Sequence, residues 1–449
     1  MLRCFYIGQI SLSNLAAACN CAPNQSVEQS ATIFSSPSRQ KPSMTTTAAT
    51  TPVKPPLPLL EFIALMALLT SLVALSIDAM LPALNQIGSD LNSQSSQQTY
   101  LVISLFFGGM ALGQIFFGPF ADARGRRLTI LIGLIIFIIG TFVCYFAQSI
   151  EILLLGRVIQ AFGVSGPRVA SMAVIRDQYE GSAMARVMSF IGVIFILVPM
   201  LAPLVGQAVM QYFHWREIFT VFWVVAVIAG AWFFLRQPET LVRANRKKFA
   251  WHHFSDSCLW LLKQRQVMGY SIAMGFIFGA FLAYLSGSQT IFQVIYDTGD
   301  WFPLVFATLA FSIGLASFFN GMMVMKWGMQ AICDRALLFS MAFGITLTTI
   351  TLYFDGVPPL WLFVSTMFVG FFFMGMLFGN LNAMAMLPVG HIAGLGAAFI
   401  GSFTSLLAVT IAIIINTFLT TDLTPIALGF LLFAVLSFCA VQYAKEIEA

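Results

Sequence analysis

Twelve apolar runs of about twenty residues constrain the fold of this chain more than any other feature of its sequence. A helix of that length crosses a hydrocarbon core of roughly 30 Å. Because barrel strands are shorter and alternate in polarity, the runs predict helices rather than strands. The sequence therefore predicts an all-α membrane protein with twelve transmembrane helices. The predicted spans are Leu59–Asp78, Thr99–Phe117, Leu128–Gln148, Ile152–Ile175, Val187–Val209, Ile218–Leu235, Met268–Ser288, Phe302–Met323, Ala336–Tyr353, Leu360–Gly379, Gly394–Asn416 and Thr424–Tyr443.

The composition supports a lipid environment. Apolar residues make up 59% of the 449 residues and charged residues only 9%, against roughly 45–50% and about 25% in soluble domains. A chain this poor in charge cannot cover a surface that faces water.

Basic residues gather in one set of the predicted loops. The loops after odd-numbered spans contain one basic residue, Arg216, whereas those after even-numbered spans contain most of the others, among them Arg126, Arg176 and Arg335. Loops rich in Lys and Arg stay on the cytoplasmic side of a membrane. We therefore expect both termini in the cytoplasm of a bacterial cell, and the net charge of +4 reflects topology rather than nucleic-acid binding.

The longest connection between spans, residues 236–267, divides them six and six. It predicts an N-terminal half, 58–235, and a C-terminal half, 268–449, joined by a cytoplasmic linker. Transporters built from repeated halves hold the substrate between them near the middle of the membrane.

Residues 1–57 differ from the rest, because Pro, Thr and Ser oppose regular structure there. We expect a disordered extension, or translation that begins at Met44. The stretch Leu15–Cys19 also resembles a lipoprotein cleavage site, although only Arg3 precedes it. The seven cysteines form no disulfide or metal pattern, so no metal site is expected.

Three charged residues fall well inside the predicted spans: Asp78, Arg157 and Arg168. Each costs about 2.5–3.5 kcal/mol at a helix centre, so each calls for a functional reason. We expect Asp78 to bind and release protons, against the alternative of an acid at the outer helix end. Arg157 is expected to pair with Asp78 and tune its proton affinity, or to bind an acceptor on the substrate; the alternative is an arginine that snorkels. For Arg168 two interpretations stay open: lining a cavity or reaching the inner headgroups.

Polar and aromatic residues within spans are the candidates for a substrate cavity. Sparse amides suit a wet cavity, and aromatic and thioether side chains suit a promiscuous apolar binding site. The candidates are Gln114, Gln160, Gln289, Gln293, Asn320, Asn380, Asn382 and Asn416, together with Arg168 and with Phe378 from an aromatic cluster in span ten.

The segment between spans two and three has an unusual order of residues. Gly118 and Gly125 are expected to permit a tight turn, and Asp122 to accept hydrogen bonds at a helix N-terminus. Arg126 is expected to bridge to an acid such as Asp177. The predicted conformational latch comprises Gly118, Asp122, Gly125, Arg126, Arg127 and Asp177.

This segment resembles the signature between spans two and three of the major facilitator superfamily, usually written G-x-x-x-D-R-x-G-R-R. The chain departs from it at Ala123, where Arg is usual. Residues 155–163 resemble the span-four signature, whose Arg is matched by Arg157. The span-five antiporter signature, G-P-x-x-G-G, is matched at Pro203 and Gly206, with two of its glycines replaced.

Four further motifs are similar to those of the bicyclomycin-resistance (Bcr/CflA) drug exporters: residues 78–84, 174–177, 214–219 and 238–241. The resemblance covers about residues 58–445. It implies the major facilitator fold, proton coupling and drug-like substrates.

An enzyme is disfavoured, because the four histidines lack ligand spacing and no phosphate-binding loop or nucleophile–base cluster is present. The sequence predicts a monomeric inner-membrane antiporter that exports small lipophilic molecules. It is expected to use the proton gradient and no cofactor. The alternative is an exporter or facilitator of one metabolite, such as an amino acid or small peptide.

Overall fold

The computed structural model describes residues 57–93, 96–179, 181–241 and 258–445. Throughout these residues all regular structure is helical, and twelve of the helices have 20 residues or more. The predicted all-α fold is thus confirmed. The expectations for residues 1–56 and for most of the linker fall outside the described part of the chain.

The first group of helices comes from the N-terminal part of the described chain. A 3₁₀ turn, η1 (Leu81–Ala83), follows the first helix and leads into a short helix, α2. The members are α1 (Leu59–Asp78), α2 (Leu84–Asp90), α3 (Ser96–Arg124), α4 (Arg126–Tyr145), α5 (Ile150–Gln178), α6 (Gly181–Tyr212) and α7 (Glu217–Arg236).

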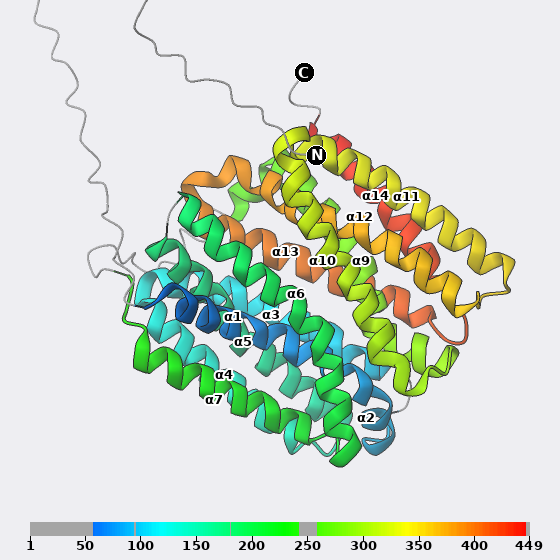
Figure 1. Ribbon diagram of the computed structural model, residues 1–449, viewed down its shortest axis with the longest axis horizontal. Coiled ribbons are helices and arrows are strands. Elements are labelled where there is room, and N and C mark those ends of the chain that lie inside the picture. Colours follow the sequence, from blue (N-terminus) through cyan, green and yellow to red (C-terminus); the bar gives the residue numbers. More distant parts are fainter. Residues whose placement is uncertain (1–56, 94–95, 180, 242–257, 446–449) are drawn as a thin grey trace, which may run out of the picture. The chain divides into compact units, whose positions relative to one another are not determined.

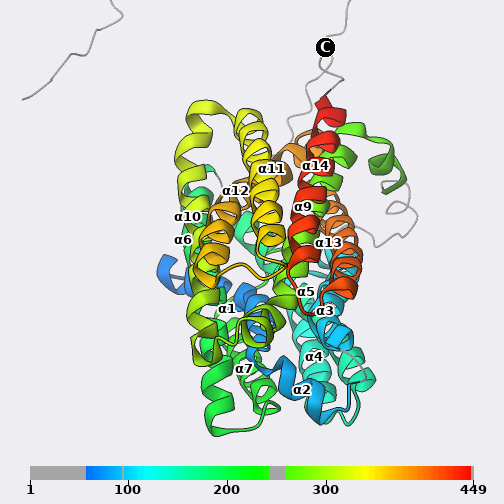
Figure 2. The ribbon, with the colours of Figure 1, turned by 90° about the vertical axis from the view of Figure 1, so that its right-hand side faces the viewer.

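The second group follows the linker. Its first helix continues into a π-helical turn, η3 (Thr290–Ile295). The members are α9 (Arg265–Gln289), α10 (Phe302–Trp327), α11 (Met329–Tyr353), α12 (Leu360–Met386), α13 (Ala393–Phe418) and α14 (Thr424–Lys445). In Figures 1 and 2 the first group, blue to green, and the second, yellow-green to red, occupy separate sides of the bundle.

The two groups have matching turns. A single glycine separates α3 from α4 and another separates α10 from α11: Gly125 with φ 107° and Gly328 with φ 77°. Such positive φ values strain any residue with a Cβ. The second and third long helices of each group are therefore joined in the same way.

Contacts between the groups run mainly through two helix pairs, α3 with α13 and α6 with α10. Within the groups, α5 packs against both α3 and α4, and α9 packs against both α13 and α14. The contact pattern therefore leaves room for a cavity between two internally packed halves.

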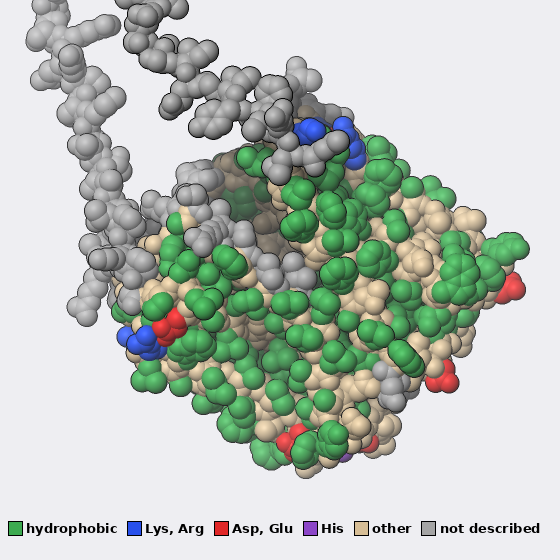
Figure 3. Space-filling view, in the orientation of Figure 1, with side chains coloured by type: hydrophobic (Ala, Val, Ile, Leu, Met, Phe, Trp, Pro, Cys, Tyr) green, Lys and Arg blue, Asp and Glu red, His purple; other side chains and the backbone are tan. Residues whose placement is uncertain are grey.

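The bundle has the surface of a membrane protein. Eleven helices in the described residues are long and apolar enough to cross a bilayer, and α6 contributes the apolar stretch Leu197–Tyr212. Figure 3 shows a face whose middle is covered by hydrophobic side chains. Lys and Arg lie at its upper and left edges, and most Asp and Glu lie at its right and lower edges.

Candidate functional site

A cavity of about 590 Å³ lies between the two groups of helices. The first group contributes residues of α1, α3, α5 and α6, and the second contributes residues of α9, α10, α12 and α13. Drug-sized ligands occupy cavities of about 300–1,000 Å³. Its size and position are those of a small-molecule site between two halves.

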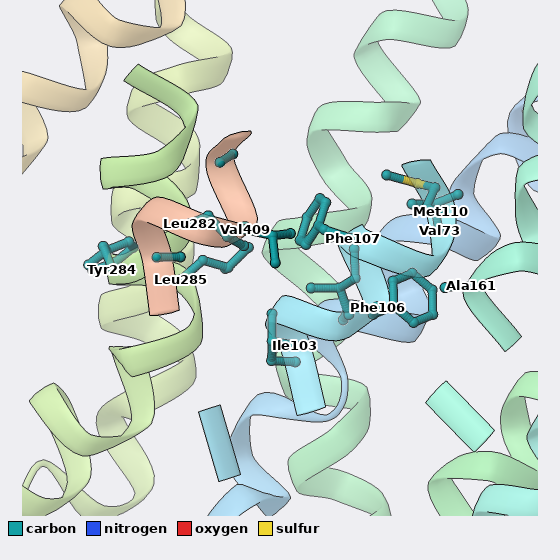
Figure 4. Packing of buried hydrophobic residues seen from close by; sticks show 14 of the residues in the cluster. Val73, Ile103, Phe106, Phe107, Met110, Ala161, Leu282, Tyr284, Leu285 and Val409 are labelled. Atoms are coloured by element: carbon teal, nitrogen blue, oxygen red, sulfur yellow. The ribbon is translucent and has the colours of Figure 1, made fainter. Parts of the chain in front are cut away.

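Aromatic side chains form much of the cavity wall. Phe107 on α3 lies 5.3 Å, between ring centroids, from Phe278 on α9, so one ring contact joins the two halves. Tyr284 stacks edge-on against Phe371 at 4.8 Å. Figure 4 shows Phe107 pointing from α3 toward α9 and α13. The aromatic lining residues are Phe107, Phe278, Phe281, Tyr284, Phe306, Phe371 and Phe378.

Two charged side chains, Asp78 and Arg168, line this cavity. Asp78 is the last residue of α1 and is only 5% exposed. Arg168 follows Pro167 within α5, and its Nη1 lies 3.1 Å from the Met110 sulfur. No ion pair involving either residue occurs within the described ranges. Of the two interpretations of Arg168, the structure favours the cavity.

Arg157 is fully buried but does not pair with Asp78, so that expectation is wrong. Its Nε donates to Val102 O at 3.2 Å, and Nη1 and Nη2 donate to Gln160 Oε1 at 2.6 Å and Ser76 O at 2.9 Å. The guanidinium also lies 4.3 Å from the Phe106 ring centroid. Arg157 therefore links α1, α3 and α5, because its donors bond to acceptors on all three helices.

Phe378 and Asn320 line the cavity, whereas the other seven candidate amides do not. Gln160 is held in the helix packing by Arg157 and by Thr141 Oγ1 at 2.8 Å. Asn380 donates to Asn320 Oδ1 at 2.6 Å, and Asn320 is the amide that reaches the cavity.

The other amides take different positions. Gln114 is buried beside Gly401 at the α3–α13 contact, and Asn382 is exposed. Gln289 donates to Pro82 O at 3.2 Å and to Gln293 Oε1 at 2.9 Å. Because helix rotation decides where a side chain points, a polar residue inside a span can face a neighbouring helix instead of the cavity.

Polar contacts also join the halves beside η1 and η3. Tyr100 donates its hydroxyl hydrogen to Thr290 Oγ1 at 3.0 Å. This bond and the bond from Gln289 to Pro82 border a second pocket, of about 340 Å³, lined mainly by hydroxyl and amide groups. Both bonds join the first group of helices to the second at this pocket.

The predicted latch forms a compact ion-pair cluster. Arg126 Nη1 lies 2.7 Å from Asp122 Oδ1, and Arg126 Nε lies 3.1 Å from Asp177 Oδ2. Gly125 makes the turn, but Gly118 does not, since it lies within α3 and faces Ala398 of α13. Asp122 lies in the last turn of α3 and not at the N-terminus of α4, where it was expected.

Glu239 and Thr240 complete this cluster, although the sequence analysis gave them no role. Glu239 accepts hydrogen bonds from Arg126 N at 2.9 Å and Arg127 N at 3.1 Å, so it caps the N-terminus of α4. Thr240 Oγ1 donates to Asp177 Oδ2 at 2.7 Å. The sequence motif at residues 238–241 contains both residues and is the signal that could have identified them. All these residues belong to the first group of helices or directly follow it. The cluster therefore stabilises the first group.

Pro203 and Gly206 lie inside α6, where Pro199 is a second proline. Gly206 packs directly on the backbone that follows Asp78, because a Cβ there would lie 2.0 Å from Ala79 O. The span-five motif therefore lets α6 pack closely against the end of α1.

A bundle of membrane-length helices in two groups, with a cavity between them, defines the class of multi-pass membrane transporters. The sequence matches the Major Facilitator Superfamily over residues 66–413. The chain belongs to this family, so it is a transport protein and not an enzyme.

Two relatives match most of the chain. The bicyclomycin resistance protein homolog of Haemophilus influenzae is 31% identical over 345 residues, 76% of this chain and 85% of that protein. The uncharacterized MFS-type transporter YdgK of Bacillus subtilis is 30% identical over the same shares of the two chains. The multidrug resistance protein MdtL of Salmonella heidelberg is 33% identical over 172 residues, 38% of this chain and 43% of that protein.

Solved structures share the fold at low identity. The xylose transporter XylE from E. coli, in a partially occluded inward-open conformation, has a TM-score of 0.67 at 12% identity. That match covers 87% of this chain and 98% of the other. The human organic anion transporter MFSD10 has a TM-score of 0.64 at 16% identity and covers 87% of this chain and 100% of the other.

Proposed function

We propose that this protein exports small, largely apolar or drug-like molecules across a bacterial inner membrane in exchange for protons. The observation that carries the proposal is a buried carboxylate, Asp78, in an aromatic cavity between the two halves. An intramembrane acid without a fixed cation is suited to reversible protonation. The names of two relatives, a bicyclomycin resistance protein homolog and a multidrug resistance protein, support drug-like substrates.

In this mechanism Asp78 takes a proton while the cavity faces the outside and releases it after the cavity turns inward. One proton moving down a potential of 100 mV contributes about 2.3 kcal/mol, which sustains roughly a fiftyfold substrate gradient. Arg157 acts as a positioning residue, because it holds the carbonyl of Ser76, two residues before Asp78. No cofactor takes part.

Alternating access requires contacts between the halves that break and re-form. We propose that the Tyr100–Thr290 and Gln289–Pro82 hydrogen bonds form the outer closure. The ion-pair cluster around Arg126 then keeps the first half rigid as it rocks against the second half. In this topology the Gly125 turn and both termini lie in the cytoplasm, and one chain suffices for transport.

Proton flux in vesicles that contain the purified protein tests this function. A panel of lipophilic antibiotics and dyes should evoke proton movement by the wild type, and Asp78→Asn should abolish it while still folding. Asp355→Asn is the matched control, because it removes a carboxylate in the α11–α12 turn, outside both the cavity and the cluster around Arg126. Wild-type flux in Asp78→Asn would remove Asp78 as the coupling group.

The same panel separates the exporter from a carrier of a single metabolite. Responses to many unrelated compounds support the exporter, whereas a response to one amino acid or small peptide alone supports the alternative.

A further inference from the structure

The central cavity contains two opposite charges that no described protein group neutralises. Asp78 and Arg168 both line it, and neither takes part in an ion pair within the described residues. Arg157 differs, because three hydrogen bonds and an aromatic ring satisfy its guanidinium. Of these two arginines of α5, Arg168 thus has fewer hydrogen bonds, and this follows from its place in the cavity.

Arg168 has further N–H donors available to a ligand. Its hydrogen bond to the Met110 sulfur uses one of five N–H groups, and a thioether is a weak acceptor. A guanidinium presents its donors in a planar fork that matches a carboxylate. The chemistry of this side of the cavity therefore suits an anionic group on the substrate.

Asp78 offers the complementary partner. An ionised carboxylate accepts hydrogen bonds from an ammonium group, and aromatic faces attract cations as well. The rings of Phe281 and Tyr284 line the same cavity. A substrate amine at Asp78 would compete with the proton, which is the competition that antiport requires.

Tyr284 supplies a third polar group. The residue is 1% exposed, and its hydroxyl has no hydrogen-bond partner in the described part of the chain. A buried hydroxyl left without a partner is costly, so a ligand that hydrogen-bonds to it gains affinity.

We propose that the cavity selects aromatic zwitterions, with a cationic amine at Asp78, a carboxylate at Arg168 and an apolar ring system between the phenylalanine side chains. This inference rests on the proposed export function and names its substrate class. A simple cation leaves Arg168 without a counter-charge, and a simple anion leaves Asp78 without one. A zwitterion compensates both and lets the aromatic wall bind the rest of the molecule.

Matched probes test the proposal by isothermal titration calorimetry on the full-length purified protein. Norfloxacin carries an amine and a carboxylate on an aromatic body; its N-acetyl derivative lacks the positive charge, and its decarboxylated derivative lacks the negative one. The wild type should bind norfloxacin at least tenfold more tightly than either derivative. A charge-assisted hydrogen bond accounts for a preference of about this size.

The variants assign each charge to its residue. Arg168→Gln should bind norfloxacin and the decarboxylated derivative with similar affinity, and still discriminate against the N-acetyl derivative. Asp78→Asn should show the reverse pattern. Arg168→Lys keeps the charge without the fork and should retain part of the carboxylate preference. If Arg168→Gln fails to fold, Arg168→Lys and the wild-type ratios carry the test.

Equal affinity of the wild type for all three probes would overturn the proposal, and so would an unchanged carboxylate preference in Arg168→Gln. Drug-evoked proton flux in either case would leave the exporter function intact. The expected binding pattern without any proton flux would support the zwitterion site and contradict proton coupling instead.

Discussion

Arg157 and Arg168 stand three helical turns apart on α5, yet their surroundings differ completely. Arg157 is fully buried among carbonyl and amide oxygens, whereas Arg168 reaches the cavity beside a thioether. Arginine thus stabilises helix packing at position 157 and is a candidate ligand-binding group at position 168. The sequence signature drew attention to Arg157, but the arginine that lines the cavity is Arg168.

This difference predicts different stabilities. Arg157→Ala leaves buried acceptors on α1, α3 and α5 without a donor and should destabilise the protein by about 3 kcal/mol. Arg168→Gln removes no ion pair and should unfold close to the wild-type temperature. Thermal unfolding of the detergent-purified variants, followed by intrinsic fluorescence, measures both. A midpoint for Arg157→Ala at or above that of Arg168→Gln would contradict the structural role.

At the scale of elements, two positions set the packing of α4 and α6. Glu239, from the segment after α7, caps the first turn of α4 through two backbone N–H groups. Gly206 lets α6 approach the backbone that follows Asp78. In both cases a residue distant in sequence decides where a helix begins or how closely it packs.

Glu239→Gln should lower the stability of the first half by about 1 kcal/mol, because the amide keeps an acceptor but loses the charge that favours a helix N-terminus. Asp122→Asn should have a smaller effect, since the Asp122 side chain is 38% exposed. Unfolding midpoints of the two variants under identical detergent conditions make the comparison. A larger loss in Asp122→Asn would show that the cap contributes little.

Gly206→Ala should cost about 1–3 kcal/mol through overpacking against Ala79 and should also slow transport, because the clash lies next to Asp78. Gly321→Ala is the control: it lies within α10, and a Cβ there would meet nothing within 4 Å. Thermal unfolding and drug-evoked proton flux are measured for both. Equal behaviour of the two variants would mean that α6 tolerates displacement from α1.

At the scale of the whole molecule, the placement of charge predicts the orientation in the membrane. The α10–α11 turn is flanked by Lys326 and Arg335, and the next turn contains Asp355. Reporter domains fused after Gly328 and after Asp355 should therefore lie on opposite sides of the membrane, with the Gly328 fusion in the cytoplasm. Reporters on the same side would refute the twelve-span topology.

The sequence alone determined the number of membrane-length helices, the family and the glycine turn at Gly125. These features depend on hydrophobic length and on local backbone conformation, which neighbouring residues set. The predicted contact of Arg126 with Asp177 is also present, whereas the contact of Arg126 with Asp122, one helical turn earlier, was not predicted.

Only the tertiary structure decided which side chains face the cavity. Helices in a bilayer are apolar on every side, so no polar face in the sequence reveals how each helix is rotated. For this reason Gln160 and Asn380 were predicted in the cavity but bind neighbouring groups, and Arg157 was paired with the wrong partner. The association of Asp78, Arg168 and Tyr284 around one cavity follows from the packing of α1, α5 and α9, which no local pattern encodes.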